Sequence, residues 1–156
     1  MGNGLAGFMK GLTVLLAEDN EDDAHLVHLA MKRAGILQPL QVVADGVEAV
    51  DYLCAKGRYE DRKQFPFPRV LITDLKMPRM NGFEFLEWLN NHPECSVIPC
   101  VVFSASAQEP DVERAYRLGA SAYFRKPATL NELCDLLNIV FSFWTLCLKP
   151  ILPDKC

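Results

Sequence analysis

The stretch VLITDLKMPRMNG, residues 70–82, decides the fold of this chain. It begins with four apolar or β-branched residues, continues into one carboxylate, Asp74, and ends with Pro78 and the pair Asn81-Gly82. A short apolar run bounded by turn residues is typical of a strand buried on both faces, as in a parallel sheet. Asp74 then lies at the carboxyl end of that strand, where open α/β sheets place their reactive groups.

Apolar runs and helix-capping residues alternate along the rest of the chain. We expect strands at residues 12–17, 40–43, 70–73, 97–103 and 122–124. We expect helices at residues 21–34, 47–55, 83–91, 110–118 and 130–143. Asn20, with Asp23 three residues on, caps the first of them, and Asn81 and Thr129 are further side-chain caps. This alternation predicts an α/β, flavodoxin-like, doubly wound (βα)5 fold, with a five-stranded parallel sheet of order 2-1-3-4-5.

Length and composition restrict the class of protein. A chain of 156 residues is long enough for one domain with a proper core. We expect a flexible leader at residues 1–10, a single domain at 11–148 and a tail at 149–156. The net charge of −4 argues against nucleic acid as a partner. The longest apolar run, residues 139–148, is about half of the ~20 residues that a membrane span needs, so we expect a cytoplasmic protein with no membrane contact.

The six cysteines show no C-x-x-C pairing. Without an export signal, this spacing favours reduced thiols over disulfides or a zinc site, and it predicts an exposed Cys156.

Polar side chains follow four of the five expected strands. Glu18 and Asp19 follow the first strand, Asp74 the third, Ser104 the fourth and Lys126 the fifth. Because the first and third strands are neighbours in the predicted order, three carboxylates crowd one crevice. Two such charges ~4 Å apart repel by about 4 kcal/mol at an effective dielectric near 20, so the cluster needs a cation. Oxygen ligands of this kind suit Mg²⁺, with Mn²⁺ as a substitute, and argue against zinc.

Four motifs together resemble the receiver domain of two-component response regulators. They are EDN at residues 18–20, DLKMPRMNG at 74–82, Ser104-Ala105, and YFRKP at 123–127. They occur in the order and spacing of that family, over about residues 12–143. The resemblance implies that Asp74 accepts a phosphoryl group from a phosphohistidine of a sensor histidine kinase.

The same resemblance implies a ligand set for the cation and a charge partner for the phosphoryl group. Asp19 and Asp74, with the backbone carbonyl of Lys76, are expected to bind Mg²⁺, and Glu18 acts directly or through a water. Lys126 is expected to pair with the phosphoryl oxygens.

A further group of residues is implied in switching and in phosphate lifetime. Ser104 is expected to move inward and donate a hydrogen bond to the phosphoryl group, and Tyr123 is the aromatic switch that turns inward with it. Lys76 and Ser106, two residues beyond Asp74 and Ser104, are expected to tune hydrolysis.

The insert at residues 58–68 is basic and aromatic, and we interpret it as a solvated loop, because the net acidic charge disfavours RNA binding. Together with DGVEA at 45–49 and FWTL at 143–146, it resembles the stand-alone regulators that pair with bacterial phytochromes. We therefore expect output through contacts with a downstream protein, whose identity the sequence does not give.

The end of the last helix carries more apolar surface than one helix face can bury. Two interpretations follow: an additional layer of core, or a homodimer contact, which the clustered aromatic side chains favour. The residues concerned are Val140, Phe141, Phe143, Trp144, Leu146 and Leu148.

Two other classes of protein are alternatives. A haloacid-dehalogenase-like, Mg²⁺-dependent phosphatase needs a second aspartate two residues after the nucleophile, where this chain has Lys76. A flavodoxin-like module that binds a small ligand needs a glycine-rich turn after the first strand, where this chain has Glu18-Asp19.

Overall fold

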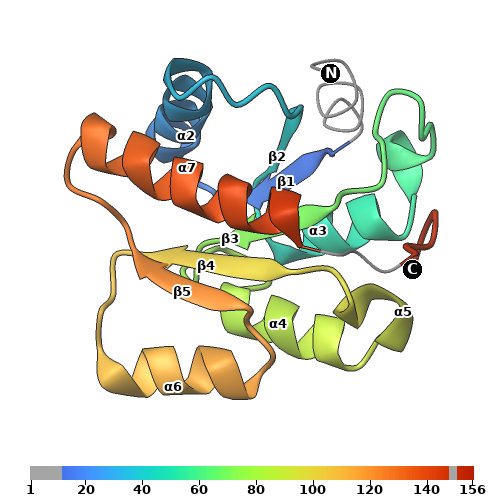
Figure 1. Cartoon of the computed structure of the whole chain (residues 1–156). Coiled ribbons are helices and arrows are strands. Elements are labelled where there is room, and N and C mark those ends of the chain that lie inside the picture. Colours follow the sequence, from blue (N-terminus) through green and yellow to red (C-terminus); the bar gives the residue numbers. More distant parts are fainter. Residues whose placement is uncertain (1–11, 148–150) are drawn as a thin grey trace.

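The computed structural model describes residues 12–147 and 151–156, so the predicted leader at residues 1–10 lies outside the described residues. A parallel sheet with helices on both faces forms the molecule (Figure 1). In chain order the elements are β1 (Val14–Ala17), α2 (Glu21–Arg33), β2 (Leu40–Val43), α3 (Gly46–Leu53), the 3₁₀ turn η1 (Gly57–Tyr59), β3 (Val70–Thr73), α4 (Gly82–Asn90), α5 (Pro93–Ser96), β4 (Cys100–Ser104), α6 (Glu109–Arg117), β5 (Ala122–Arg125) and α7 (Leu130–Leu146).

The strand order is β2-β1-β3-β4-β5, and every neighbouring pair is parallel. This confirms the predicted doubly wound fold. In the register of β1 and β3, Val14 pairs with Val70 and Ala17 pairs with Thr73. The two strands therefore end level with each other, and the residues that follow them, Glu18 and Asp74, emerge side by side.

Alternate residues of the strands supply two cores. Leu15, Leu71 and Val102 belong to the core under α3 and α4, whereas Leu16 and Ile72 belong to the core under α2 and α7. Figure 1 shows α2 and α7 on one side of the sheet and α4 and α6 on the other. Because both faces are covered, the central strands are apolar except for the terminal Thr73 and Ser104, as expected of a parallel sheet.

The predicted helix caps form. The side chain of Asn20 accepts a hydrogen bond from the backbone N–H of Asp23 at 3.0 Å. Asn81 and Glu84 form a complete capping box at the start of α4. The side chain of Thr129 accepts from the N–H of Glu132 at 3.2 Å. These bonds satisfy N–H groups that a helix start otherwise leaves unpaired.

The insert at residues 58–68 is not the solvated loop that we expected. Tyr59 is only 4% exposed, and its ring centroid lies 5.0 Å from that of Tyr52 and 5.1 Å from that of Phe65. The guanidinium of Arg62 donates to the backbone carbonyl of Leu53 at 2.9 Å. The charged groups of the insert lie at its surface, while its aromatic rings pack over the end of α3. The apolar area that these rings bury fixes the insert to the domain despite its charge.

The segment between α4 and β4 also differs from the expectation. It forms a short helix, α5, and β4 begins at Cys100 rather than at residue 97. Pro93 occupies the first turn of α5, where its missing N–H costs nothing.

The cysteine prediction was wrong for one pair. Cys95 and Cys156 form a disulfide, with their Cα atoms 5.9 Å apart. The segment 151–156 returns to the body of the domain, where the N–H of Cys156 donates to the carbonyl of Leu53 at 3.0 Å. The two cysteines are 61 residues apart in sequence, so no local spacing could indicate the pairing.

The last helix divides its apolar residues between two environments. Val140 and Phe141 are buried against the sheet, so part of the surface is core. Ile139, Phe143 and Leu146 are exposed. Leu148 lies outside the described residues. Within residues 12–147 and 151–156, no helix is long and apolar enough to cross a membrane.

Candidate functional site

The site lies at the carboxyl edge of the sheet, where backbone hydrogen bonds continue just past the strand ends. The N–H of Glu18 donates to Val43 at 2.9 Å, and the N–H of Asp74 donates to Ala17 at 3.0 Å. The N–H of Lys126 donates to the carbonyl of Ser104 at 2.7 Å. The side chains of the site therefore start from backbone that the sheet holds in place.

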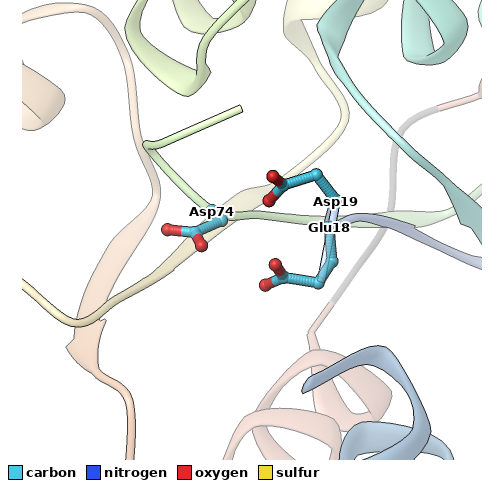
Figure 2. A group of neighbouring side chains, drawn as sticks. All are labelled: Glu18, Asp19 and Asp74. Atoms are coloured by element: carbon cyan, nitrogen blue, oxygen red, sulfur yellow. The ribbon is translucent and has the colours of Figure 1, made fainter. Parts of the chain in front are cut away.

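Three carboxylates converge on one point. Glu18, Asp19 and Asp74 each offer one oxygen, and these oxygens lie within 4.8 Å of one another (Figure 2). Glu18 and Asp74 are 6% and 8% exposed, whereas Asp19 faces solvent. All the possible ligand atoms are hard carboxylate oxygens, and the solvent-exposed side of the cluster at Asp19 leaves room for the waters that Mg²⁺ retains. The residues present thus fit a divalent cation of this type, as the sequence predicted.

The ammonium of Lys126 lies beside this cluster and contacts three carboxylates. Its Nζ is 2.8 Å from Oδ2 of Asp74, 2.9 Å from Oε2 of Glu18 and 2.8 Å from Oδ2 of Asp23. The first two contacts follow from the predicted strand order. Asp23 was expected only as the residue whose N–H pairs with the cap of α2, and its side-chain role was missed. Its position in the first turn of the helix that directly follows Glu18 and Asp19 was the available signal.

Burial and charge act on this group in opposite directions. Burial raises the pKa of the Glu18 carboxyl to about 7, although Lys126 and the N–H of Asn20 favour the ionised form. Burial lowers the pKa of Lys126, but its hydrogen bonds to Asp23, Asp74 and Glu18 outweigh burial and raise the pKa above its usual value. The ammonium therefore stays charged at neutral pH. Burial first, and the nearby charge of Asp74 to a lesser degree, disfavour the ionised form of Glu18, and a bound cation would favour that form.

The loop after β3 holds Asp74 by its backbone. Oδ1 of Asp74 accepts from the N–H of Leu75 at 2.6 Å, and the carbonyl oxygen of Asp74 accepts from the hydroxyl of Thr73 at 2.8 Å. A Cβ on Gly82 would lie 2.2 Å from that carbonyl oxygen, so only glycine fits there. The sequence indicated a turn at this glycine, but the requirement is the close approach of two backbone segments.

An ion pair fixes the same loop from the side of α3. Nε of Arg79 lies 2.7 Å from Oδ2 of Asp45, and Asp45 also caps α3 through the N–H of Glu48 at 2.9 Å. Arg79 has a φ of 61°, a left-handed conformation that is uncommon for a residue with a side chain. The pair ties the start of α3 to the loop after β3.

The predicted switch residues meet at Ser106. The hydroxyl oxygen of Ser104 accepts from the N–H of Ser106 at 3.1 Å, and the hydroxyl of Tyr123 donates to the carbonyl of Ser106 at 2.8 Å. The side chain of Ser106 donates to Asp111 at 2.7 Å. Ser104 is buried, and Tyr123 is partly buried. The loop after β4 is therefore hydrogen-bonded to the end of β4, to β5 and to α6.

Two cavities adjoin the cluster. A hollow of about 610 Å³ is lined by Asp19, Lys76, Ser104 and Ser106 among others. A smaller cavity is lined by residues that include Glu18, Asp23, Asp74 and Lys126. The structure thus brings every predicted site residue to one edge of the sheet. The binding of a cation by the carbonyl of Lys76 stays a prediction.

Residues 14–138 match the model of the response regulator receiver domain. The chain belongs to this family. The receiver domain is a signalling module. This family membership disfavours both alternatives, the phosphatase and the module that binds a small ligand.

Relatives of this receiver domain include regulators of light signalling. Response regulator Rcp1 of Synechocystis sp. is 33% identical over 131 residues, which cover 84% of this chain and 87% of Rcp1. The crystal structure of response regulator RPA3017, from red light signalling of R. palustris, is 29% identical with a TM-score of 0.85. The phosphorylated cyanobacterial phytochrome response regulator RcpA is 30% identical with a TM-score of 0.80. Both structural matches cover 90% of this chain and 99% of the other. A structure of Rcp1 is described as Mn²⁺-bound.

Proposed function

We propose that this receiver domain takes a phosphoryl group onto Asp74 from the phosphohistidine of a sensor histidine kinase, with Mg²⁺ as the resident cation. The contact that carries the proposal is the 2.8 Å pair between Lys126 and Asp74, beside two further carboxylates that fit a divalent cation. The Mn²⁺-bound structure of Rcp1 and the phosphorylated structure of RcpA support it, because these relatives match nearly the whole receiver fold.

The transfer needs little covalent chemistry from the protein. A carboxylate oxygen of Asp74 attacks phosphorus in line with the bond to the donor nitrogen, that P–N bond breaks, and the electron pair leaves with the nitrogen. A bound Mg²⁺ offsets negative charge on the acceptor and phosphoryl oxygens. Lys126 supplies a further positive charge through an N–H that now donates to Asp74.

Ser104 supplies the hydrogen bond that senses the phosphoryl group. Its oxygen accepts from the N–H of Ser106, which leaves its hydroxyl hydrogen to donate to a phosphoryl oxygen. Any inward movement of Ser104 also moves Ser106, to which Tyr123 is bonded. The phosphoryl group adds nearly two negative charges, enough to shift the population of the loop after β4 and of β5. A downstream protein reads that surface.

The kinase that we propose is of the phytochrome type. RcpA and RPA3017 carry light-signalling names, and the similarity to each covers 90% of this chain. Such pairing places the receiver domain in the cytoplasm, where the kinase phosphorylates it.

We also infer that two copies associate through α7. Ile139, Phe143 and Leu146 are 65%, 58% and 82% exposed, and their spacing places them along one side of the helix. An exposed apolar stripe of this kind is typical of a protein interface. The partner is a second copy of this chain, since one stripe can pack against its symmetry mate.

Incubation with acetyl phosphate and MgCl₂ tests the proposed phosphorylation. We expect a mass increase of one phosphoryl group, stable in acid and labile in base, that is absent in Asp74→Asn and in EDTA. A phytochrome-type histidine kinase, autophosphorylated beforehand, is expected to transfer its label to the same residue. Continuous hydrolysis of phosphomonoesters without a stable protein-bound phosphate would overturn the proposal in favour of a phosphatase.

A further inference from the structure

Among the residues that the structure describes, Asp23 is the one carboxylate bonded to Lys126 that lies outside the candidate cation cluster. That cluster comprises Glu18, Asp19 and Asp74. Asp23 lies in the first turn of α2, and its side chain is 40% exposed, yet its Oδ2 lies 2.8 Å from Nζ of Lys126. It also lines the small cavity that holds Glu18, Asp74 and Lys126. Neither the cation nor the nucleophile requires an acid at this position.

The number of N–H donors on the Lys126 ammonium explains the position of Asp23. A lysine ammonium has three N–H donors, and Glu18, Asp23 and Asp74 each accept one hydrogen bond from it. The bond to Asp74 is the one that a phosphoryl oxygen can take over. Glu18 also belongs to the candidate cation cluster, so a bound ion would share its oxygens. Asp23 is therefore the acceptor that Lys126 can keep throughout the transfer.

The stem of Lys126 makes such an anchor useful. Four methylene groups leave an ammonium free to take many positions, whereas catalysis by charge depends on a fixed one. Asp23 is itself fixed, because its backbone N–H is bonded to the side chain of Asn20 at 3.0 Å in the cap of α2. The helix start thus holds the carboxylate, and the carboxylate holds the ammonium.

We propose that Asp23 is a positioning residue, which holds the ammonium of Lys126 where it meets the phosphoryl group during transfer to Asp74. This inference rests on the proposed function. It predicts that Asp23 affects the maximal rate of phosphorylation and leaves the binding of the phosphodonor unchanged, because Lys126 acts on charge that develops in the transition state.

The experiment uses the full chain, acetyl phosphate as the phosphodonor and saturating MgCl₂. Asp23→Ala removes the carboxylate, Asp23→Asn keeps a hydrogen-bond acceptor without the charge, and Asp22→Asn is the matched control. Asp22 is the exposed neighbour on the same helical turn, so its substitution changes the net charge equally. Melting temperatures confirm that each variant is folded.

We expect Asp23→Ala to lower the maximal phosphorylation rate about tenfold, with the half-saturating donor concentration unchanged. Asp23→Asn is expected to stay within about threefold of the unmodified chain, because its amide oxygen still accepts the bond. Asp22→Asn is expected to have no effect.

A second measurement follows the ammonium itself. The ¹H–¹⁵N signal of the Lys126 ammonium, assigned by its loss in Lys126→Ala, is expected to be sharp in the unmodified chain. It is expected to broaden in Asp23→Ala and to persist in Asp22→Asn.

Two results would overturn the inference. One is an unchanged rate and an unchanged ammonium signal in Asp23→Ala. The other is an equal change in Asp22→Asn and Asp23→Ala, which would assign the effect to net charge. If the unmodified chain itself takes no phosphoryl group onto Asp74, the proposed function fails instead, and the two failures are thereby distinguished.

Discussion

The hydroxyl of Tyr123 and the hydroxyl of Ser104 are both hydrogen-bonded to Ser106. Tyr123 donates to its carbonyl at 2.8 Å, and Ser104 accepts from its N–H at 3.1 Å. One peptide segment therefore joins the residue proposed to sense the phosphoryl group to the residue proposed to report it. We therefore expect the ring of Tyr123 and the loop after β4 to move together.

Replacement of Tyr123 by phenylalanine tests this connection. The loss of one hydrogen bond removes about 1 kcal/mol of local stability, so we expect amide exchange at residues 104–108 to accelerate about fivefold. Hydrogen exchange followed by mass spectrometry measures it. Tyr116→Phe is the control for the loss of a neighbouring tyrosine hydroxyl, which accepts from the N–H of Tyr123 at 3.1 Å. Equal exchange in Tyr123→Phe and in the unmodified chain would contradict the prediction.

Gly82→Ala is expected to destabilise the fold by about 2 kcal/mol, because the new Cβ would lie 2.2 Å from the carbonyl oxygen of Asp74. Denaturant unfolding measures this cost. Gly35→Ala is the comparison, since it meets no atom within 4 Å and carries only the strain of its φ of 72°. Its cost is expected to be about 1 kcal/mol. A larger loss in Gly35→Ala than in Gly82→Ala would show that the close contact relaxes easily.

The pKa of Glu18 predicts how stability depends on pH when no metal is bound. Since burial raises this pKa from 4.5 to about 7, the folded chain binds more protons than the unfolded chain between these values. The free energy of unfolding therefore falls as pH rises through that window. The raised pKa of Lys126 adds no slope there, because the ammonium is charged in both states.

Urea titrations in EDTA between pH 5 and pH 7 measure this slope. We expect Glu18→Gln to reduce it and saturating Mg²⁺ to reverse it, because the cation binds the ionised carboxylates. An unchanged slope in Glu18→Gln would assign it to another group.

The exposed stripe on α7 predicts the outcome of a charge substitution. Phe143→Glu places a carboxylate at the centre of the proposed contact between copies, and we expect sedimentation to show a monomer where the unmodified chain sediments as a dimer. Asn131→Glu introduces the same charge at the far end of α7 and is expected to leave the dimer intact. A monomeric unmodified chain would contradict the prediction.

The disulfide predicts a redox-dependent stability. A cross-link that closes a loop of this length stabilises a chain by about 4 kcal/mol, equivalent to about 10 °C in the melting temperature. We expect Cys156→Ser to lose that amount under oxidising conditions and nothing in excess reductant. Cys100→Ser tests whether any cysteine has this effect, and its own loss is expected to be the same in both conditions, because Cys100 is a free thiol.

Features that depend on local patterns were predictable from the sequence. The apolar runs gave the strands, and their alternation with helices gave the order of the sheet, which brought Glu18 and Asp74 to adjacent strand ends. The helix caps at Asn20 and Asn81 were also local, since each joins residues three apart. The position of the acidic cluster follows from the strand order and the local caps alone.

What the sequence concealed depends on contacts between distant segments. The 151–156 segment reaches Leu53 and Cys95 across the domain, and no periodicity records such a return. The burial of Tyr59 was not predicted, because the residues around it are charged. A ring and an arginine at adjacent positions can nevertheless face opposite environments. Asp23 had already been given a local role in the cap, and only the folded position of Lys126 shows the second one.

The absence of space between Gly82 and the carbonyl of Asp74 has a mechanical consequence. The helix α4 starts in direct contact with the peptide of Asp74, so no free space separates the proposed phosphoryl acceptor from this helix. We therefore expect a displacement of that peptide on phosphorylation to move the start of α4 with it. If the helix stays rigid, the displacement is largest at its far end, where α4 adjoins α5.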